Sequence, residues 1–313
     1  MQSLGLFGIY KEAYKAIFSC RKIFSQIILA LILPLCIIYL AHLKIDDLMF
    51  KRISFTHLKI SQTPNGSPDL RKLYQQVSSE WTLYFLFQAA YYAFVLVFSL
   101  LSTSAVVYNV ACMYADRDMT FKKVMHVVPR VWKRLMVTLL CTFVACFAYF
   151  MVFGLVLCAW ILTVWNTKAG LPVLIIIFIL YVTGSLYLTM VWQLASVVSV
   201  LEKTYGFKAV MKSKNLVKGN MWVASFIVLQ FTIFIMAVLF LFNAYVVYLH
   251  VGWLVRLGIA LLSVLLLLVI VLFGLVIQTI MYFVCKSYHH ENIEKTILSE
   301  HLEEIYLGEY KSI

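Results

Sequence analysis

Six long apolar runs, separated by shorter polar segments, dominate the pattern of the 313-residue chain. Each run is long enough to cross the hydrocarbon core of a bilayer, for which an α-helix needs about 20 residues. The runs are continuously apolar rather than alternating, which favours helices over the strands of a membrane barrel. The predicted spans cover residues 23–42, 81–114, 135–165, 171–200, 221–249 and 259–285.

The composition supports this interpretation. Hydrophobic residues make up 63% of the chain and charged residues 13%, and the mean hydropathy is +0.92. A soluble domain has roughly 45–50% apolar and about 25% charged residues. Because a chain with so little polar surface cannot cover itself in water, the sequence predicts an all-α, polytopic transmembrane helix bundle with six spans.

Lysine and arginine residues predict the orientation. With six spans, both termini share a side with the loops at 115–134 and 201–220, and this side carries eighteen of the 26 Lys and Arg residues. The positive-inside rule therefore places this side in the cytosol. The membrane itself stays open: endoplasmic reticulum, another endomembrane or the plasma membrane. The predicted parts are a cytosolic amphipathic N-terminal segment (1–22), a six-span domain (23–285) with an outside loop at 43–80, and a cytosolic acidic amphipathic tail (286–313).

Two further features bear on this topology. Residues 23–42 are not followed by a cleavage site of small residues, and they are interpreted as an uncleaved signal anchor. The single N-x-S/T triplet of the sequence begins at Asn65, in the outside loop, and is a candidate glycosylation site. The alternative is that the sequence PNGSP around Asn65 simply forms a turn.

Basic amphipathic segments follow the second and fourth spans. Apolar residues at 121–128 and 207–211 recur at helical spacing among Lys residues, which predicts two interfacial helices in the headgroup plane of the cytosolic face. Their shared sequences, FKKVM and FKAVM, indicate either a direct repeat or a chance match. We expect anionic lipid headgroups, and no nucleic acid, as partners of the nearby basic residues. These residues are Lys122, Lys123, Arg130, Lys133, Arg134, Lys208, Lys212, Lys214 and Lys218.

A motif lies in the stretch WQLASVVSVLEKTYGFKAVMKSKNLVKG, residues 192–219. Its residues are Trp192, Glu202, Phe207, Ala209, Ser213, Leu216 and Gly219. The motif resembles the membrane domain that accompanies some bacterial glycerophosphodiester phosphodiesterases, and the layout of the chain is similar to a family of uncharacterised plant six-span proteins. The resemblance implies a membrane fold without an activity, because in those enzymes the chemistry belongs to a separate soluble domain. The small residues of the motif also favour a purely structural role in close helix packing.

Polar groups are sparse within the spans. The interiors of the six runs contain no Asp, Glu, Lys, Arg or His, which argues against ion-coupled transporters and membrane metalloenzymes because these need such groups in the bilayer. The amides and hydroxyls of the runs are expected to form interhelical hydrogen bonds or, alternatively, to line a weakly polar path. They are Gln88, Ser102, Thr103, Ser104, Asn109, Gln193, Ser196, Gln230, Asn243 and Gln278.

The sequence contains no motif for an enzyme. There is no GxSxG, P-loop or HExxH sequence, and the seven cysteines do not have the spacing of a zinc site. No catalytic residue, cofactor or metal is therefore predicted. The acidic tail has apolar residues at helical spacing, which is typical of a helix that packs on its own protein or binds a protein partner.

Three functions remain after these exclusions. We expect a non-catalytic membrane module that organises lipids or partner proteins, because its spans are uncharged and its cytosolic segments are basic. The alternative is a facilitative carrier or channel for a lipid or a small neutral solute. A membrane enzyme is the third hypothesis.

Overall fold

The computed structural model describes residues 5–64, 67–116, 120–163, 167, 170–249 and 252–288. This part of the chain is helical without any strand, and six of its helices are long and apolar enough to cross a membrane. The predicted all-α fold with six spans is confirmed, and the chain is an integral membrane protein. The elements are α1 (Leu6–Ser19), α2 (Arg21–Ile27), the π-helical segment η1 (Ile28–Ile32), α3 (Leu33–Gln62), α4 (Pro68–Tyr114), α5 (Phe121–Thr163), α6 (Gly170–Leu201), α7 (Phe207–Val217), α8 (Met221–Phe242), the π-helical segment η2 (Asn243–Tyr248) and α9 (Trp253–Tyr288).

The chain forms two compact units. The first unit consists of residues 1–27, 100–233 and 272–313, and the second consists of residues 28–99 and 234–271. Helices α4, α8 and α9 each contribute a part to both units.

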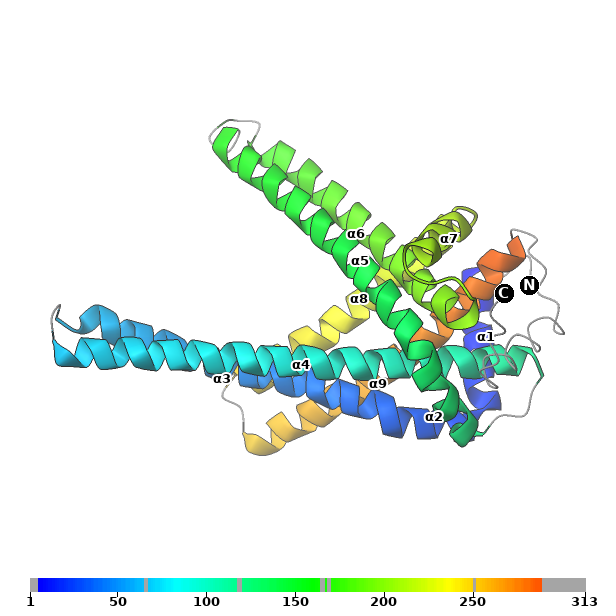
Figure 1. Cartoon of the computed structure of the whole chain (residues 1–313), viewed down its shortest axis with the longest axis horizontal. Coiled ribbons are helices and arrows are strands. Elements are labelled where there is room, and N and C mark those ends of the chain that lie inside the picture. Colours follow the sequence, from blue (N-terminus) through cyan, green and yellow to red (C-terminus); the bar gives the residue numbers. More distant parts are fainter. Residues whose placement is uncertain are drawn as a thin grey trace. The chain divides into compact units, whose positions relative to one another are not determined.

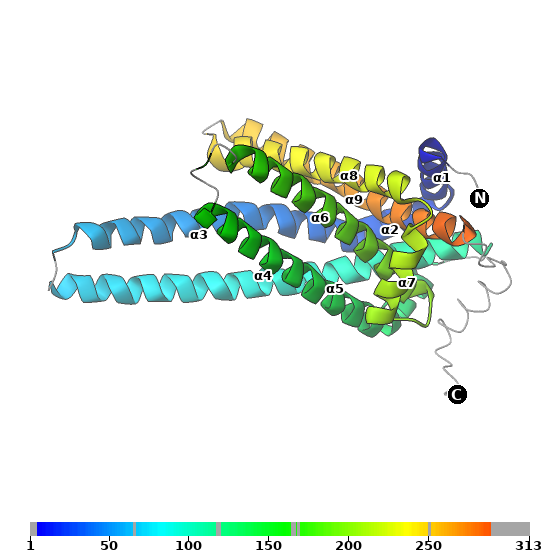
Figure 2. The same ribbon diagram turned by 90° about the horizontal axis from the view of Figure 1, so that it is seen from above.

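The second unit contains a long helical hairpin, in which α3 and the first part of α4 lie side by side (Figures 1 and 2). The predicted outside loop at 43–80 is helical at residues 43–62 and 68–80. Its charged residues are compatible with helices because they pair across the hairpin: Arg52 Nε lies 3.0 Å from Glu80 Oε1, and Thr56 donates a hydrogen bond of 3.0 Å to Glu80 Oε2. The sequence pattern shows these charges but does not show their partners.

Polar contacts link the helices of the second unit near the end of the first predicted span. His42 Nε2 lies 2.9 Å from Gln88 Oε1, and Gln88 Nε2 donates to Asp46 Oδ1 at 2.7 Å. Lys44 donates to the carbonyl of Val247 at 3.2 Å, which satisfies one of the carbonyls left without a helical partner at the end of η2. The interhelical role expected for Gln88 is confirmed.

Pro34 explains the π-helical segment that precedes α3. A proline has no N–H and its ring crowds the carbonyl four residues earlier, which is Ala30. The π-helical geometry of η1 accommodates the missing N–H and the crowded carbonyl, so the helix continues from Arg21 to Gln62. In the first unit, α5 likewise continues through Pro129, so the segment 121–128 is the beginning of α5 rather than a separate interfacial helix.

The first unit contains a second hairpin, made of α5 and α6, which lie side by side (Figures 1 and 2). Aromatic side chains of α5 fasten it: Tyr149 donates to the carbonyl of Tyr181 at 2.8 Å, and Trp160 donates to the carbonyl of Gly170 at 3.1 Å. A Cβ atom on Gly184 would lie 2.5 Å from the Tyr149 hydroxyl oxygen. This close approach therefore requires a glycine.

We predict that Gly184→Ala destabilises the α5–α6 hairpin by about 1–3 kcal/mol, the usual cost of forcing an extra methyl group into a packed site. The methyl group would displace the Tyr149 hydroxyl from its hydrogen bond to Tyr181. The melting temperature of the purified protein in detergent measures this. Gly154→Ala is the matched control, because nothing lies within 4 Å of its Cβ position. Equal melting temperatures for the two variants would contradict the proposed close approach.

Candidate functional site: the α7 surface and the Glu202 cluster

Helix α7 is held against α6 and α5 by the link that precedes it. The link ends at Gly206, whose φ of +65° is a conformation that glycine adopts without strain. The Gly206 N–H donates to Thr138 Oγ1 of α5 at 2.8 Å, and this oxygen lies 2.7 Å from Ser199 Oγ of α6. Two helices and the start of a third are thus tied at one buried hydroxyl.

One face of α7 is buried. Ala209, Ser213, Leu216 and Val217 are buried, and the Ser213 hydroxyl donates to the carbonyl of Val191 at 3.0 Å. Small side chains allow the backbones of α7 and α6 to approach closely, as in other membrane helix contacts. Three residues of the motif, Ala209, Ser213 and Leu216, therefore have a structural role.

Glu202 is the centre of a cluster of polar side chains, which we call the Glu202 cluster: Glu202, Lys212, Tyr282 and Lys286. The Lys212 ammonium lies 2.8 Å from Glu202 Oε2, and the Lys286 ammonium lies 3.3 Å from Glu202 Oε1. The Tyr282 hydroxyl donates to Oε1 at 2.6 Å. The side chain of Glu202 is only 14% exposed. One carboxylate thus connects the end of α6 with the middle of α7 and the last turns of α9.

The surroundings of Glu202 favour its ionised form. Burial by itself raises the pKa of this carboxyl, but hydrogen bonds from Lys212 and Tyr282 and the charge of Lys286 lower it by more, so that the pKa lies below its ordinary value. The carboxylate is therefore charged at neutral pH. With two lysines against one glutamate, the cluster has a net positive charge.

The opposite face of α7 is exposed and mixes large apolar side chains with lysines. We call it the α7 surface: Phe207, Lys208, Met211, Lys214 and Lys218. Phe207 is 68% and Met211 50% exposed. Residues 207, 211, 214 and 218 follow the i, i+4, i+7, i+11 spacing of one helix face. Apolar groups beside lysines are typical of a helix at the level of lipid headgroups.

The other basic residues expected to contact lipid lie at several places. Lys122, Lys123 and Lys133 are exposed at the beginning of α5, and Arg134 is half-buried there. The side chain of Arg130 lies outside the described part of the structure. Lys212 differs from the other lysines of α7, because it pairs with Glu202 within the protein.

Trp192 and Gly219 are motif residues that lie outside α7. Trp192 lines a pocket between α5 and α6. Gly219 follows α7, and a Cβ atom there would overlap the ring of Tyr288 at the end of α9. The structure thus places Ala209, Ser213 and Leu216 on the buried face of α7. Glu202 pairs with Lys212 of α7, and Gly219 meets Tyr288 directly after α7. Two other predictions, glycosylation at Asn65 and the acidic tail from residue 289 onward, lie outside the described residues.

Sequence reasoning missed two members of the Glu202 cluster, Tyr282 and Lys286. Their i, i+4 spacing places both on one face of the last helix, but nothing in the sequence indicates that this face meets Glu202.

The expectation of interhelical hydrogen bonds is confirmed for Gln278, whose amide donates to the Gln193 carbonyl and to Ser196 Oγ, each at 2.6 Å. For Asn109 it is wrong, because both polar side-chain atoms are buried and have no hydrogen-bond partner among the described residues.

We predict that Glu202→Gln lowers the free energy of unfolding by about 2 kcal/mol or more, because it leaves two lysines beside a neutral amide. Thermal unfolding in detergent measures the change. The folded pKa of Glu202 is lowered, so its stabilising effect is present above the pKa of the unfolded chain and is lost as the pH falls through the folded pKa. The difference between wild type and variant should therefore be constant around neutral pH and shrink only in acid.

Lys72→Gln is the control for this prediction. It removes a pair between Lys72 and Asp69 in which both side chains are more than 70% exposed, so we expect a change within about 0.5 kcal/mol. If Glu202→Gln changed stability as little as this control, the Glu202 cluster would not hold α7 in place.

Comparison with known proteins leads to a family. No curated protein and no solved structure matches the chain. A family model described as "Domain of unknown function (DUF8558)" matches residues 1–313. Because this match covers the whole chain, including both hairpins and α7, the protein belongs to the DUF8558 family.

Proposed function

We propose that the protein is a non-catalytic membrane module that gathers anionic lipids at its cytosolic face. The observation that carries this proposal is the α7 surface, where exposed Phe207 and Met211 lie beside Lys208, Lys214 and Lys218. Apolar side chains that reach below the headgroups and lysines at headgroup level match the two layers of a lipid interface.

The Glu202 cluster supports this proposal because it holds α7 rigidly. An isolated helix of 11 residues is unstable in water, so α7 depends on its contacts with α6 and α9. Lysines on a fixed helix lose less conformational freedom when they bind headgroups than lysines on a flexible loop. A fixed α7 surface therefore favours sustained binding of lipids over brief contact with them.

The proposed orientation follows the distribution of basic residues. Both termini, the 115–134 segment and the α7 region are in the cytosol in this proposal, because eighteen of the 26 Lys and Arg residues lie on that side. Anionic lipids are concentrated in the cytoplasmic leaflet, which agrees with lysines on α7. The endoplasmic reticulum, another endomembrane or the plasma membrane would each provide such a leaflet.

Three glutamines of the spans support a packed module more than a transport path. Gln88 and Gln278 are engaged in hydrogen bonds between helices, as is Gln230, which accepts a hydrogen bond of 2.9 Å from Tyr10. Residues 192–219 resemble the membrane domain that accompanies some glycerophosphodiester phosphodiesterases, and the layout of the chain is similar to plant six-span proteins. Both resemblances imply a membrane fold without its own chemistry, which agrees with a non-catalytic module.

We predict that the triple variant Lys208→Gln, Lys214→Gln, Lys218→Gln loses its preference for anionic lipid. Each lysine near a charged membrane surface contributes about 1 kcal/mol, so the ratio of bound phosphatidylserine to phosphatidylcholine should fall by about tenfold or more. The ratio is measured by native mass spectrometry of the full chain released from nanodiscs that contain both lipids. The preference of the wild type should weaken at high salt.

The control variant removes the same charge from the α3–α4 hairpin: Lys59→Gln, Arg71→Gln, Lys72→Gln. All three residues are exposed, and the proposal places them on the other side of the membrane, so the lipid ratio should not change. An equal loss in both variants would show a general charge effect, and no loss in the α7 variant would overturn the proposal.

A further inference from the structure

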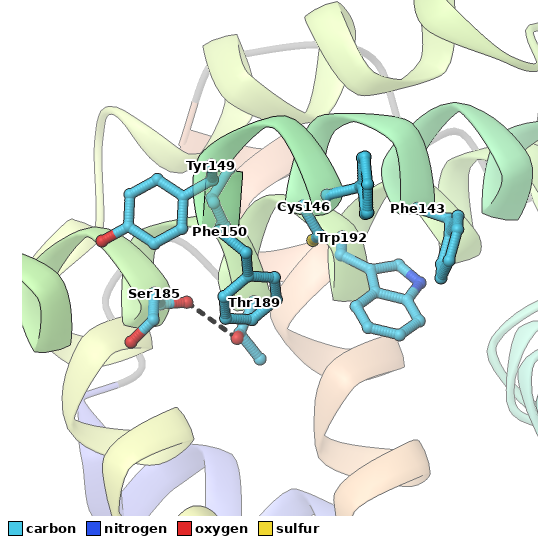
Figure 3. A pocket seen from close by; sticks show the side chains of 9 residues that line it. Phe143, Cys146, Tyr149, Phe150, Ser185, Thr189 and Trp192 are labelled. Atoms are coloured by element: carbon cyan, nitrogen blue, oxygen red, sulfur yellow. Dashed lines mark hydrogen bonds between the residues drawn. The ribbon is translucent and has the colours of Figure 1, made fainter. Parts of the chain in front are cut away.

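A pocket lies between α5 and α6 in the membrane-spanning part of the hairpin. The helices are tied at one end by the hydrogen bond from Tyr149 to Tyr181 and at the other end by the contact between Thr138 and Ser199. Between these ties lies a pocket of about 290 Å³. Figure 3 shows Tyr149 and Ser185 at one end of this pocket and Phe143 and Trp192 at the other.

The lining of the pocket is apolar and aromatic. From α5 come Phe143, Phe147 and Phe150, together with Cys146. The three phenylalanines are each more than half exposed, so the pocket is open to the surface of the hairpin. In the membrane this surface faces lipid chains, because only 6% of the most apolar stretch of α5, and none of that of α6, is buried within the protein.

One hydrogen-bond donor in the pocket stands out. The hydroxyls of Ser185, Thr189 and Tyr149 all donate to backbone carbonyls, at 2.8 Å in each case. The indole N–H of Trp192 has no hydrogen-bond partner among the described residues. An N–H group without an acceptor is costly in hydrocarbon, since no water is present to satisfy it. An oxygen of a ligand in the pocket would remove this cost.

The depth of Trp192 indicates which oxygen this is. Trp192 precedes the end of α6 by nine residues, or about 14 Å along the helix axis. The 32 residues of α6 measure about 48 Å, about 18 Å more than the hydrocarbon core. If the excess is shared between both ends, Trp192 lies about 5 Å below the boundary of the core on the α7 side. Glycerolipids carry their ester carbonyls at this boundary.

We infer that this pocket binds one acyl chain of a membrane glycerolipid, with the indole N–H of Trp192 donating to the ester carbonyl. The acyl chain lies against Phe143, Phe147 and Phe150. This assigns a binding role to Trp192, a motif residue that takes no part in holding α7. The inference depends on the membrane location of the hairpin and does not depend on the lysines of α7.

Graded delipidation of the full chain, followed by native mass spectrometry, tests this site. Wild type purified from phosphatidylcholine nanodiscs should retain one glycerolipid that resists detergent longest. Leu188→Trp places a large side chain in the pocket and should abolish this retention. Leu180→Trp, at a residue of the same helix that is 67% exposed, is the matched control and should retain the lipid.

Trp192→Phe tests the hydrogen bond itself. It keeps an aromatic ring and removes the N–H, so retention should weaken by about fivefold, the ratio that one net hydrogen bond provides. Retention equal to that of wild type would overturn the role of the indole.

A photoactivatable phosphatidylcholine with a diazirine in its acyl chain locates the bound lipid. Peptides that contain Cys146 and Trp192 should be labelled more strongly than the region around Leu180. Uniform labelling, or stronger labelling of these peptides by a sterol probe, would overturn the inference. The triple lysine variant of α7 should retain the lipid in the pocket, so failure of the lipid-gathering function and failure of this site give different results.

Discussion

The arrangement of α7 in the first unit depends on one largely buried carboxylate, that of Glu202. Glu202 receives hydrogen bonds or ion pairs from Lys212 of α7 and from Tyr282 and Lys286 of α9. Removing water from a single charge in this position would be costly, and three partners offset that cost. Because α7 has only 11 residues and cannot form a stable helix alone, these contacts, together with the hydroxyl of Ser213, determine where its other face points.

The two faces of α7 differ in their surroundings: one is buried against the protein and the other is exposed. Residues that are small or apolar, such as Ala209 and Leu216, are buried against the spans. Phe207 and Met211 are exposed although they are among the largest apolar residues of the helix. An apolar residue on the outside is explained if the outside is lipid, and the same argument applies to the aromatic residues that line the pocket of the α5–α6 hairpin. In both places the protein presents apolar surface next to a polar group, which is the arrangement that the proposed lipid contacts require.

The α5–α6 hairpin shows how close packing and an open pocket arise from the same pair of helices. Gly184 lets α6 approach Tyr149, and the pair Thr138 and Ser199 closes the other end. Between these points bulky residues, including Phe147 and Trp192, line the pocket. The cavity is thus bounded by two close contacts and not by a loose end of the hairpin.

The sequence by itself determined the fold class, the six spans and the amphipathic character of α7, because each follows from local properties: the length of an apolar run, the spacing of apolar residues and the sum of charges. It also identified Glu202, Ser213 and Gly219 as members of a motif, without showing which residues they contact. Only the tertiary structure decided that Lys212 pairs inward while Lys214 points outward, that Lys286 completes the Glu202 cluster, and that residues 43–62 and 68–80 are helical. These features depend on contacts between residues up to 84 positions apart, and the pattern along a single chain contains no information on which distant faces meet.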